Sequence, residues 1–188
     1  MPFIATFDAN VLYPISLCDL FITTLESGLY RAHWSTEILA EVGRTYQRNF
    51  PEKDLSLIQR RIDLMNVAEP AALIDPPREL IDAMTNDPKD RHVLATAVAV
   101  GADVLVTFNL DDFPEDSCSP YGVEPQHPDE FVEHLVDLDP TAIWRSLEKM
   151  AGRRRNPPAT PEDVRSYLAE HDLPGAMRLL AETERGRT

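Results

Sequence analysis

Four acidic residues of this sequence lie where a protein could use carboxylates for chemistry. Asp8 closes the apolar run at residues 3–7, and Asp112 follows a second apolar run of β-type residues. Glu41 lies at the margin of the apolar face of a predicted helix, and Asp90 lies near the start of another. In an open α/β sheet, ligands collect outside the carboxyl ends of the strands. An acid that follows a strand therefore points into a binding crevice.

Each acid also has a local explanation when it is taken alone. Glu41 can be a solvated side chain at the border of an amphipathic face. Asp90 suits the first turn of a helix, where a carboxylate caps amide groups and interacts with the dipole. Asp112 lies in the segment Asn-Leu-Asp-Asp-Phe-Pro, which is typical of an Asx-turn.

Topology favours a shared role for these acids. Strand ends and helix N-termini meet at one edge of such a sheet, so we expect Asp8, Asp90 and Asp112 there, with Glu41 in reach. Ionised carboxylates packed together raise one another's pKa unless a cation neutralises them. Oxygen ligands without Cys or His suit Mg²⁺ or Mn²⁺, and such ions serve phosphoryl chemistry.

The elements that must position these acids alternate along the chain. Strands are expected at residues 3–8, 29–34, 71–74 and 104–107 and near Val123, with helices between them, which predicts a three-layer α/β/α sandwich around a mainly parallel sheet. One helix is expected to begin with Asp87 as its cap and Pro88 in its first position, and to run to Gly101.

The pattern changes near Asp139-Pro140, after which only helices are predicted, at residues 141–151, 161–170 and 174–184. We therefore expect a domain at 1–138 and an all-α C-terminal extension at 139–188.

Charge divides the chain in a similar way. The net charge is −14, and residues 1–139 contain 9 Lys and Arg against 25 Asp and Glu, whereas residues 140–188 contain 9 against 7. The acidic body repels nucleic acid at long range unless metal ions or a basic surface intervene. Arg153, Arg154 and Arg155 in a predicted linker could supply that basic surface for RNA, although arginines in a linker are more often simply solvated.

The sequence contains no apolar stretch long enough for a membrane span and no basic N-terminal region of a secretory signal. We therefore expect a cytoplasmic protein without a membrane partner. Its two cysteines lack the spacing of a zinc site or a disulfide framework.

The segments around the four acids resemble the PIN-domain nucleases, in particular the VapC-type toxins of prokaryotic toxin–antitoxin modules. The matching segments are FDANVL at 7–12, WSTEILAEV at 34–42, DPKDRHVLA at 87–95 and VTFNLDDF at 106–113. Their order and spacing cover about residues 1–138. The resemblance implies an α/β/α sandwich that binds Mg²⁺ or Mn²⁺ and hydrolyses RNA phosphodiesters.

The resemblance also implies roles for particular residues. The catalytic acids would be Asp8, Glu41, Asp90 and Asp112, of which Asp8, Asp90 and Asp112 would hold the metal. Asn10, Thr107 and Asn109 would support them. The number of bound metal ions, one or two, remains open, and either Asn109 or Asp112 could contact the ion.

Partners implied by the resemblance are an RNA substrate and a cognate antitoxin protein. It further suggests a homodimer through the apolar faces of the second and third helical segments, which packing in a core would explain equally well. His92 is expected to point away from the acids and receives no catalytic role.

Two other functions compete with a nuclease. A silent PIN-like module would bind RNA or protein without cutting, but the complete set of acids argues against it. A receiver-like phosphotransferase would use Asp8 as its nucleophile, but the paired acid and the late Lys that this chemistry needs are not evident.

Overall fold

The computed structural model describes residues 2–185, which fall into two compact units. Unit 1 consists of the residues up to Pro14 together with Tyr30–Gln126. Unit 2 consists of Ile15–Leu29 together with the residues from His127 onward. In the part of the chain that is described, every strand belongs to unit 1, and the regular structure of unit 2 is entirely helical.

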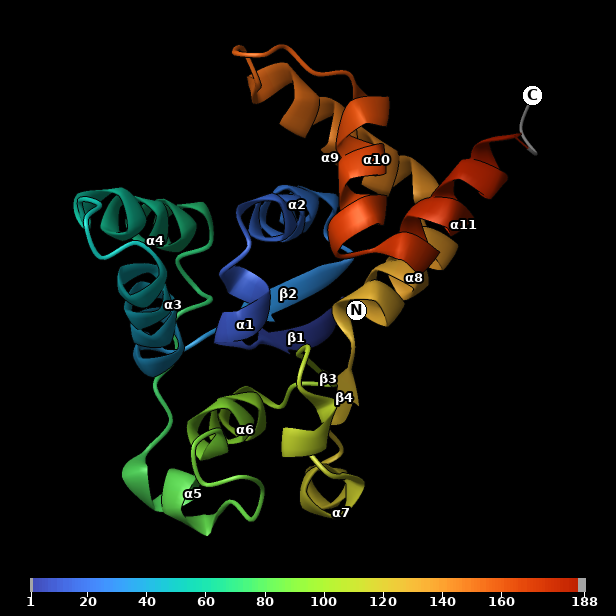
Figure 1. Cartoon of the computed structure of the whole chain (residues 1–188). Coiled ribbons are helices and arrows are strands. Elements are labelled where there is room, and N and C mark those ends of the chain that lie inside the picture. Colours follow the sequence, from blue (N-terminus) through green and yellow to red (C-terminus); the bar gives the residue numbers. More distant parts are fainter. Residues whose placement is uncertain (1, 186–188) are drawn as a thin grey trace. The chain divides into compact units, whose positions relative to one another are not determined.

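Unit 1 is built on four parallel strands in the order β2-β1-β3-β4 (Figure 1). These strands are β1 (Phe3–Phe7), β2 (Tyr30–His33), β3 (Val104–Val106) and β4 (Glu124–Gln126). Ala5 lies opposite Ala32 on one side and Val104 on the other. Because all pairings are parallel, the carboxyl ends of the strands lie at one edge, where ligands collect. The expected α/β sandwich with a parallel sheet and a helical C-terminal part is confirmed.

Unit 1 also contains the helices that position the site (Figure 1). They are α1 (Ala9–Leu12), α3 (Thr36–Asn49), α4 (Ser56–Ala68), α5 (Arg78–Ala83), α6 (Arg91–Val100) and α7 (Glu115–Cys118), with the short 3₁₀ turns η2 (Leu110–Asp112) and η3 (Ser119–Tyr121). Helix α6 packs against β1, β2 and β3, and its residues Val93, Leu94 and Ala97 are fully buried. Helix α3 packs against α1, α4 and α6. It therefore links α1, which follows β1, to α6, which covers the sheet.

The strand expected at 71–74 is wrong. Trp34, just beyond β2, makes a single isolated bridge to Leu73 there, through hydrogen bonds from Trp34 N to Ala72 O (3.0 Å) and from Ile74 N to Trp34 O (2.9 Å). Prolines at 70, 76 and 77 flank this segment and leave no room for a longer ladder.

The predicted start of the helix after Asp87 is also wrong, because α6 begins three residues after Pro88, at Arg91. The Asp87 side chain accepts a hydrogen bond from Lys89 N (2.9 Å), and Asp90 N donates to Asp87 O (3.0 Å). Asp87 therefore closes a turn of its own. Asp90 becomes the residue that precedes the helix, and its side chain makes no capping hydrogen bond.

Residues 108–120, expected as a loop, contain the short helical pieces η2 and α7 and the start of η3. Phe113 and Cys118 of this segment are buried, and this burial gives the turn-rich sequence a regular local structure.

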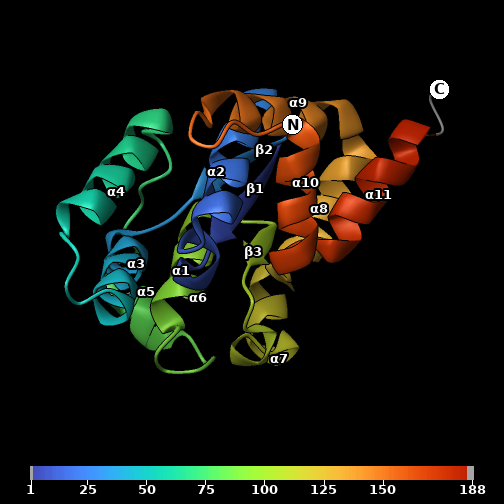
Figure 2. The same cartoon turned by 45° about the horizontal axis from the view of Figure 1, so that its top comes forward.

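Unit 2 comprises α2 (Ile15–Thr24), η1 (Leu25–Ser27), α8 (Pro128–Leu138), α9 (Pro140–Arg153), α10 (Pro161–His171) and α11 (Pro174–Arg185). Helix α11 packs against α8 and α10 (Figure 2), and α2 packs against α9. Phe21 of α2 meets Phe131 of α8 edge to face, with ring centroids 5.7 Å apart. The three helices expected after Pro140 are confirmed.

Segments distant in sequence therefore build unit 2. The Asp129 carboxylate on α8 accepts hydrogen bonds from Gly175 N (2.9 Å) and Ala176 N (2.8 Å), which satisfies free amides at the start of α11. The domain boundary expected at 138/139 stays a prediction. No helix among the described residues is both long and apolar enough to cross a bilayer.

Candidate active site

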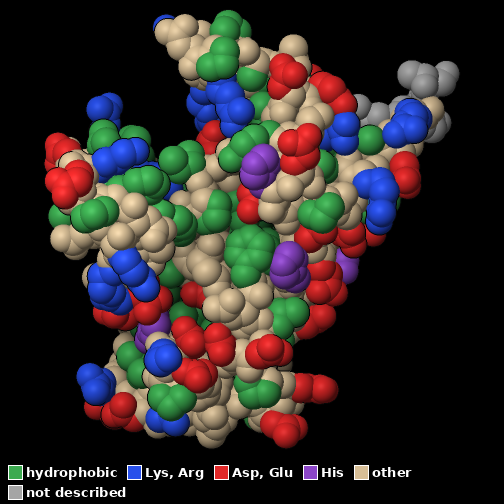
Figure 3. All heavy atoms as spheres, in the orientation of Figure 1, with side chains coloured by type: hydrophobic (Ala, Val, Ile, Leu, Met, Phe, Trp, Pro, Cys, Tyr) green, Lys and Arg blue, Asp and Glu red, His purple; other side chains and the backbone are tan. Residues whose placement is uncertain are grey.

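A cavity of about 320 Å³ in unit 1 brings most of the expected site residues together. It is lined by Asp8, Ala9, Asn10, Tyr13, Glu41, Arg44, Thr45, Arg48, Asp90 and Asn109. Figure 3 shows Asp and Glu side chains gathered around α6 and α7, with Lys and Arg side chains over α3 and α4. The residues that line the cavity come from the end of β1, from α1 and α3, from the start of α6 and from the segment after β3.

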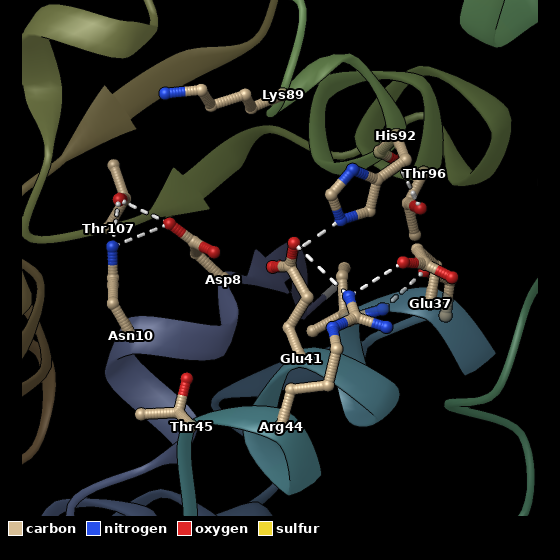
Figure 4. A network of polar contacts seen from close by, with 12 residues as sticks. Asp8, Asn10, Glu37, Glu41, Arg44, Thr45, Lys89, His92, Thr96 and Thr107 are labelled. Atoms are coloured by element: carbon tan, nitrogen blue, oxygen red, sulfur yellow. Dashed lines mark hydrogen bonds and ion pairs between the residues drawn. The ribbon is translucent and has the colours of Figure 1, made fainter. Parts of the chain in front are cut away.

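Asp8 lies at the end of β1, and its backbone N–H donates to Val106 O (3.0 Å) of β3. One carboxylate oxygen, Oδ2, accepts hydrogen bonds from Thr107 Oγ1 and from Asn10 Nδ2, both at 2.7 Å (Figure 4). Asn10 is fixed in turn, because its Oδ1 accepts from Phe108 N (3.2 Å). Adjacent strand ends thus hold the carboxylate in one orientation.

Burial raises the pKa of Asp8 above its ordinary value, and the negative charge of Glu41 adds to this effect. The hydrogen bonds from Thr107 and from the backbone of Ala9 oppose it by stabilising the charged form. Asp8 is only 4% exposed, so a cation at the cavity would meet a carboxylate that has few water molecules to displace.

Thr107 is predicted to be a positioning residue for Asp8. Thr107→Val keeps the size of this fully buried side chain but removes a hydrogen-bond donor to Asp8. We therefore expect the pKa of Asp8 to rise further and any activity that depends on Asp8 to fall about 10-fold at neutral pH. Thr107→Ser should restore most of the activity. The pH–rate profile should shift toward higher pH in the Val variant only; an unshifted profile would mean that Thr107 contributes nothing beyond packing.

Glu41 is held by two basic side chains (Figure 4). Its carboxylate lies 3.5 Å from Arg44 Nη2 and 3.6 Å from His92 Nε2, while Arg44 also pairs with Glu37 at 2.7 Å. Burial raises the pKa of Glu41, but His92 and Arg44 outweigh this and hold it below its ordinary value. Glu41 is therefore ionised and oriented toward α6.

The expectation that His92 points away from the acids is wrong. His92 is the second residue of α6, and its imidazole is directed back toward Glu41. Burial lowers the pKa of His92, but the charge of Glu41 outweighs it and raises the pKa above the ordinary value. Sequence spacing within α6 could not reveal this contact, because the partner lies on α3.

Asp90 is half-buried and lies among several other acidic residues. Its pKa is raised from 3.8 to about 6, first by burial and then by the charges of Asp8, Asp112, Glu41 and Asp87. Asp90 makes no capping hydrogen bond, so capping does not explain an acid at this position. Its carboxylate is one of the groups that face the cavity.

Asp112 and Asn109 differ in their positions. Asn109 lines the cavity, and its backbone N–H donates to Thr107 Oγ1 (3.0 Å). Asp112 is half-buried in η2 and is not among the residues that line the cavity, although its charge acts on Asp90. Which of the two contacts a metal stays a prediction.

The arginines Arg153, Arg154 and Arg155 belong to unit 2. Arg153 is the last residue of α9 and pairs with Asp19 at 2.8 Å, and Arg154 Nη2 lies 3.3 Å from Ser16 Oγ. Two of the three side chains thus contact α2, although the Arg153 side chain remains 53% exposed. Their role in RNA binding stays a prediction.

Sequence reasoning missed four residues of the cavity: the aromatic Tyr13, the hydroxyl-bearing Thr45 and the basic Arg44 and Arg48. Arg44 and Arg48 follow Glu41 by three and seven residues on the same helix, a spacing that places side chains on one face. That spacing was the signal by which they could have been found.

The donors present fit a hard divalent cation. Asp8 and Asp90 offer carboxylate oxygens, and both burial and the neighbouring negative charges that raise the pKa of Asp90 would be offset by such a cation. Within residues 2–185 no three Asp, Glu, His or Cys side chains form a ready-made ligand cage. This arrangement suits Mg²⁺, which is usually held by one or two carboxylates and retains several water molecules.

Comparison with known proteins gives matches on both parts of the chain. A family model described as "PIN domain" matches residues 5–111, and one described as "VapC50 C-terminal domain" matches residues 128–182. Over 92 residues, the chain is 42% identical to a Mycobacterium tuberculosis protein described as "Putative ribonuclease VapC50". This stretch makes up 49% of the chain and 54% of that protein, so the chain spans about half the length of the relative. The chain belongs to the PIN-domain family and has a C-terminal part that matches the VapC50 C-terminal domain.

Proposed function

We propose that this protein is a Mg²⁺- or Mn²⁺-dependent endoribonuclease and the toxin of a toxin–antitoxin pair. The observation that carries the proposal is the convergence of Asp8, Glu41 and Asp90, from three separate elements, on one cavity. The relative described as a ribonuclease supports RNA as the substrate.

In this proposal Asp8 and Asp90 would hold the cation, and Asp112 or Asn109 would complete the set from the segment after β3. When bound, Mg²⁺ or Mn²⁺ would activate water and neutralise charge on the phosphate oxygens. Thr107 and Asn10 keep the Asp8 carboxylate aimed at the cavity.

Glu41 orients the attacking water and accepts its proton. Its low pKa, set by His92 and Arg44, keeps it available as an acceptor. Attack at phosphorus breaks the bond to the 3′ oxygen, which gains a proton, so the products have 5′-phosphate and 3′-hydroxyl ends. His92 acts on this step only through Glu41.

The direct test is incubation of the purified protein with total RNA in Mg²⁺, in Mn²⁺ and in EDTA, followed by mapping of the cut ends. We expect cleavage with either ion, none in EDTA, and 5′-phosphate ends. Ends with a 2′,3′-cyclic phosphate would contradict the proposed attack by water.

The alternative is a silent PIN-like module that binds RNA or protein. Mn²⁺ binding in the micromolar to millimolar range without cleavage of any RNA would favour it. The four intact acids favour the enzyme instead.

A cognate antitoxin and a homodimer are further parts of the proposal. Helix α4 presents apolar side chains to solvent at Leu57, Leu64 and Val67, which are 61%, 58% and 74% exposed. Exposed apolar side chains grouped on one element are typical of a surface that a protein partner covers. Co-purification with the product of an adjacent small reading frame would identify the antitoxin.

A further inference from the structure

Tyr13, Thr45 and Arg48 also line the cavity, and the proposed reaction leaves them without a role. Thr45 and Arg48 follow Glu41 on α3 by four and seven residues, toward the C-terminal end of that helix, where Asn49 bonds to Tyr13. We propose that this part of the cavity is a nucleotide subsite, in which Arg48 and Thr45 bind a backbone phosphate of single-stranded RNA and Tyr13 stacks on a base next to it. The proposal rests on the proposed function and names the residues beside the acids that bind the RNA.

Arg48 is the residue suited to phosphate. Its Nη2 donates to Thr45 Oγ1 (3.3 Å), and among the described residues it makes no ion pair with an acid within 4.0 Å. Arg44, by contrast, is engaged with Glu37 and Glu41. A guanidinium without a carboxylate partner beside a hydroxyl donor offers charge-assisted hydrogen bonds to a phosphate.

Tyr13 is suited to stacking because it is fixed before any ligand binds. Its hydroxyl accepts a hydrogen bond from Asn49 Nδ2 (2.9 Å), and its carbonyl oxygen accepts one from Arg61 Nη1 (2.9 Å). Asn49 ends α3 and Arg61 lies on α4, so both helices hold this residue at the end of α1. A pre-organised aromatic ring loses little entropy on stacking.

The pairing of a cation with an aromatic ring favours a nucleotide over an acidic protein segment. An acidic peptide would use Arg48 but gain little from Tyr13, whereas an unpaired base stacks on any aromatic face. Bases in a duplex are already stacked on their neighbours, so this subsite selects single strands.

The test measures binding apart from cleavage. A short fluorescent single-stranded RNA of mixed sequence is titrated with the full chain at low salt in EDTA, where metal-dependent cutting does not compete. Arg48→Gln and Tyr13→Leu are each expected to weaken affinity about 10-fold, and Tyr13→Phe less than about 2-fold. Arg78→Gln is the matched control, because Arg78 is exposed on α5, outside the cavity lining, and pairs with the exposed Asp82 at 3.5 Å.

Two further readouts separate the two contacts. Arg48→Gln should lower the slope of log affinity against log salt by about 0.7, the value for one phosphate of a single strand, while Tyr13→Leu should leave it unchanged. An abasic oligomer should bind the parent and Tyr13→Leu equally. Thermal unfolding of each variant verifies that the fold is intact.

The proposal is overturned if Arg48→Gln and Tyr13→Leu both bind RNA like Arg78→Gln. A loss confined to Arg48→Gln, with Tyr13→Leu unaffected, also overturns it, because the site would then recognise anions without a base. If the affinities change as expected but no RNA is ever cut, the subsite stands and the proposed nuclease activity fails.

Discussion

The Asp8→Asn variant is expected to cleave RNA roughly 10³-fold more slowly than the parent in Mn²⁺ or Mg²⁺. Asn keeps the size of the side chain and an oxygen that can accept from Thr107, but it removes the charge that a cation requires. Asp8 is buried and fixed by two hydrogen bonds of 2.7 Å, so its carboxylate is already oriented before a cation binds.

Asp111→Asn is the matched control for this variant. Asp111 is an exposed acid in η2, close in sequence to the site but outside the cavity lining. We expect its activity to stay within about 2-fold of the parent, since an exposed carboxylate is screened by solvent. Cleavage measured with a fluorescent RNA, together with Mn²⁺ affinity measured by calorimetry, should fall in parallel for Asp8→Asn. Parent-like cleavage by Asp8→Asn would rule out the central role of this residue.

The Asp90→Asn variant is expected to gain stability while it loses activity. In the metal-free protein the pKa of Asp90 is raised from 3.8 to about 6, so the folded state retains this proton at pH values where the unfolded chain has released it. Stability therefore falls as the pH rises from about 4 to 6, and the full cost is present above pH 6. At pH 8, Asp90→Asn should raise the free energy of unfolding by roughly 1–2 kcal/mol, a value discounted for solvent screening. Near pH 3.5 the substitution should leave the free energy of unfolding unchanged.

Denaturant unfolding at pH 8 and at pH 3.5, with and without Mn²⁺, measures this effect. Added Mn²⁺ should stabilise the parent more than Asp90→Asn, because the ion relieves the same repulsion that the substitution removes. Cleavage by Asp90→Asn should fall at least about 100-fold. If the variant is less stable than the parent at pH 8 without metal, Asp90 is not the focus of repulsion in this site.

Local sequence was a good guide where a signal is repeated along the chain. The four strands β1, β2, β3 and β4, the helices of the C-terminal part and the acids at the strand ends follow from apolar periodicity and from turn residues. It failed where two local structures compete. Asp87 can cap a helix or close a turn, and only its bond to Lys89 N and the turn at Asp90 decide between them.

The sequence by itself determined that the chain is an α/β protein with a helical C-terminal part, and that Asp8, Glu41 and Asp90 are candidates for one site, because periodicity and strand ends are local properties. Only the tertiary structure decided that His92 and Arg44 hold Glu41, that Tyr13 and Arg48 share the cavity with the acids, and that Ile15–Leu29 packs with the helices after His127. These contacts join segments far apart in the sequence or on different elements. The direction of a side chain across such a contact depends on the packing of both elements, which neither segment encodes alone.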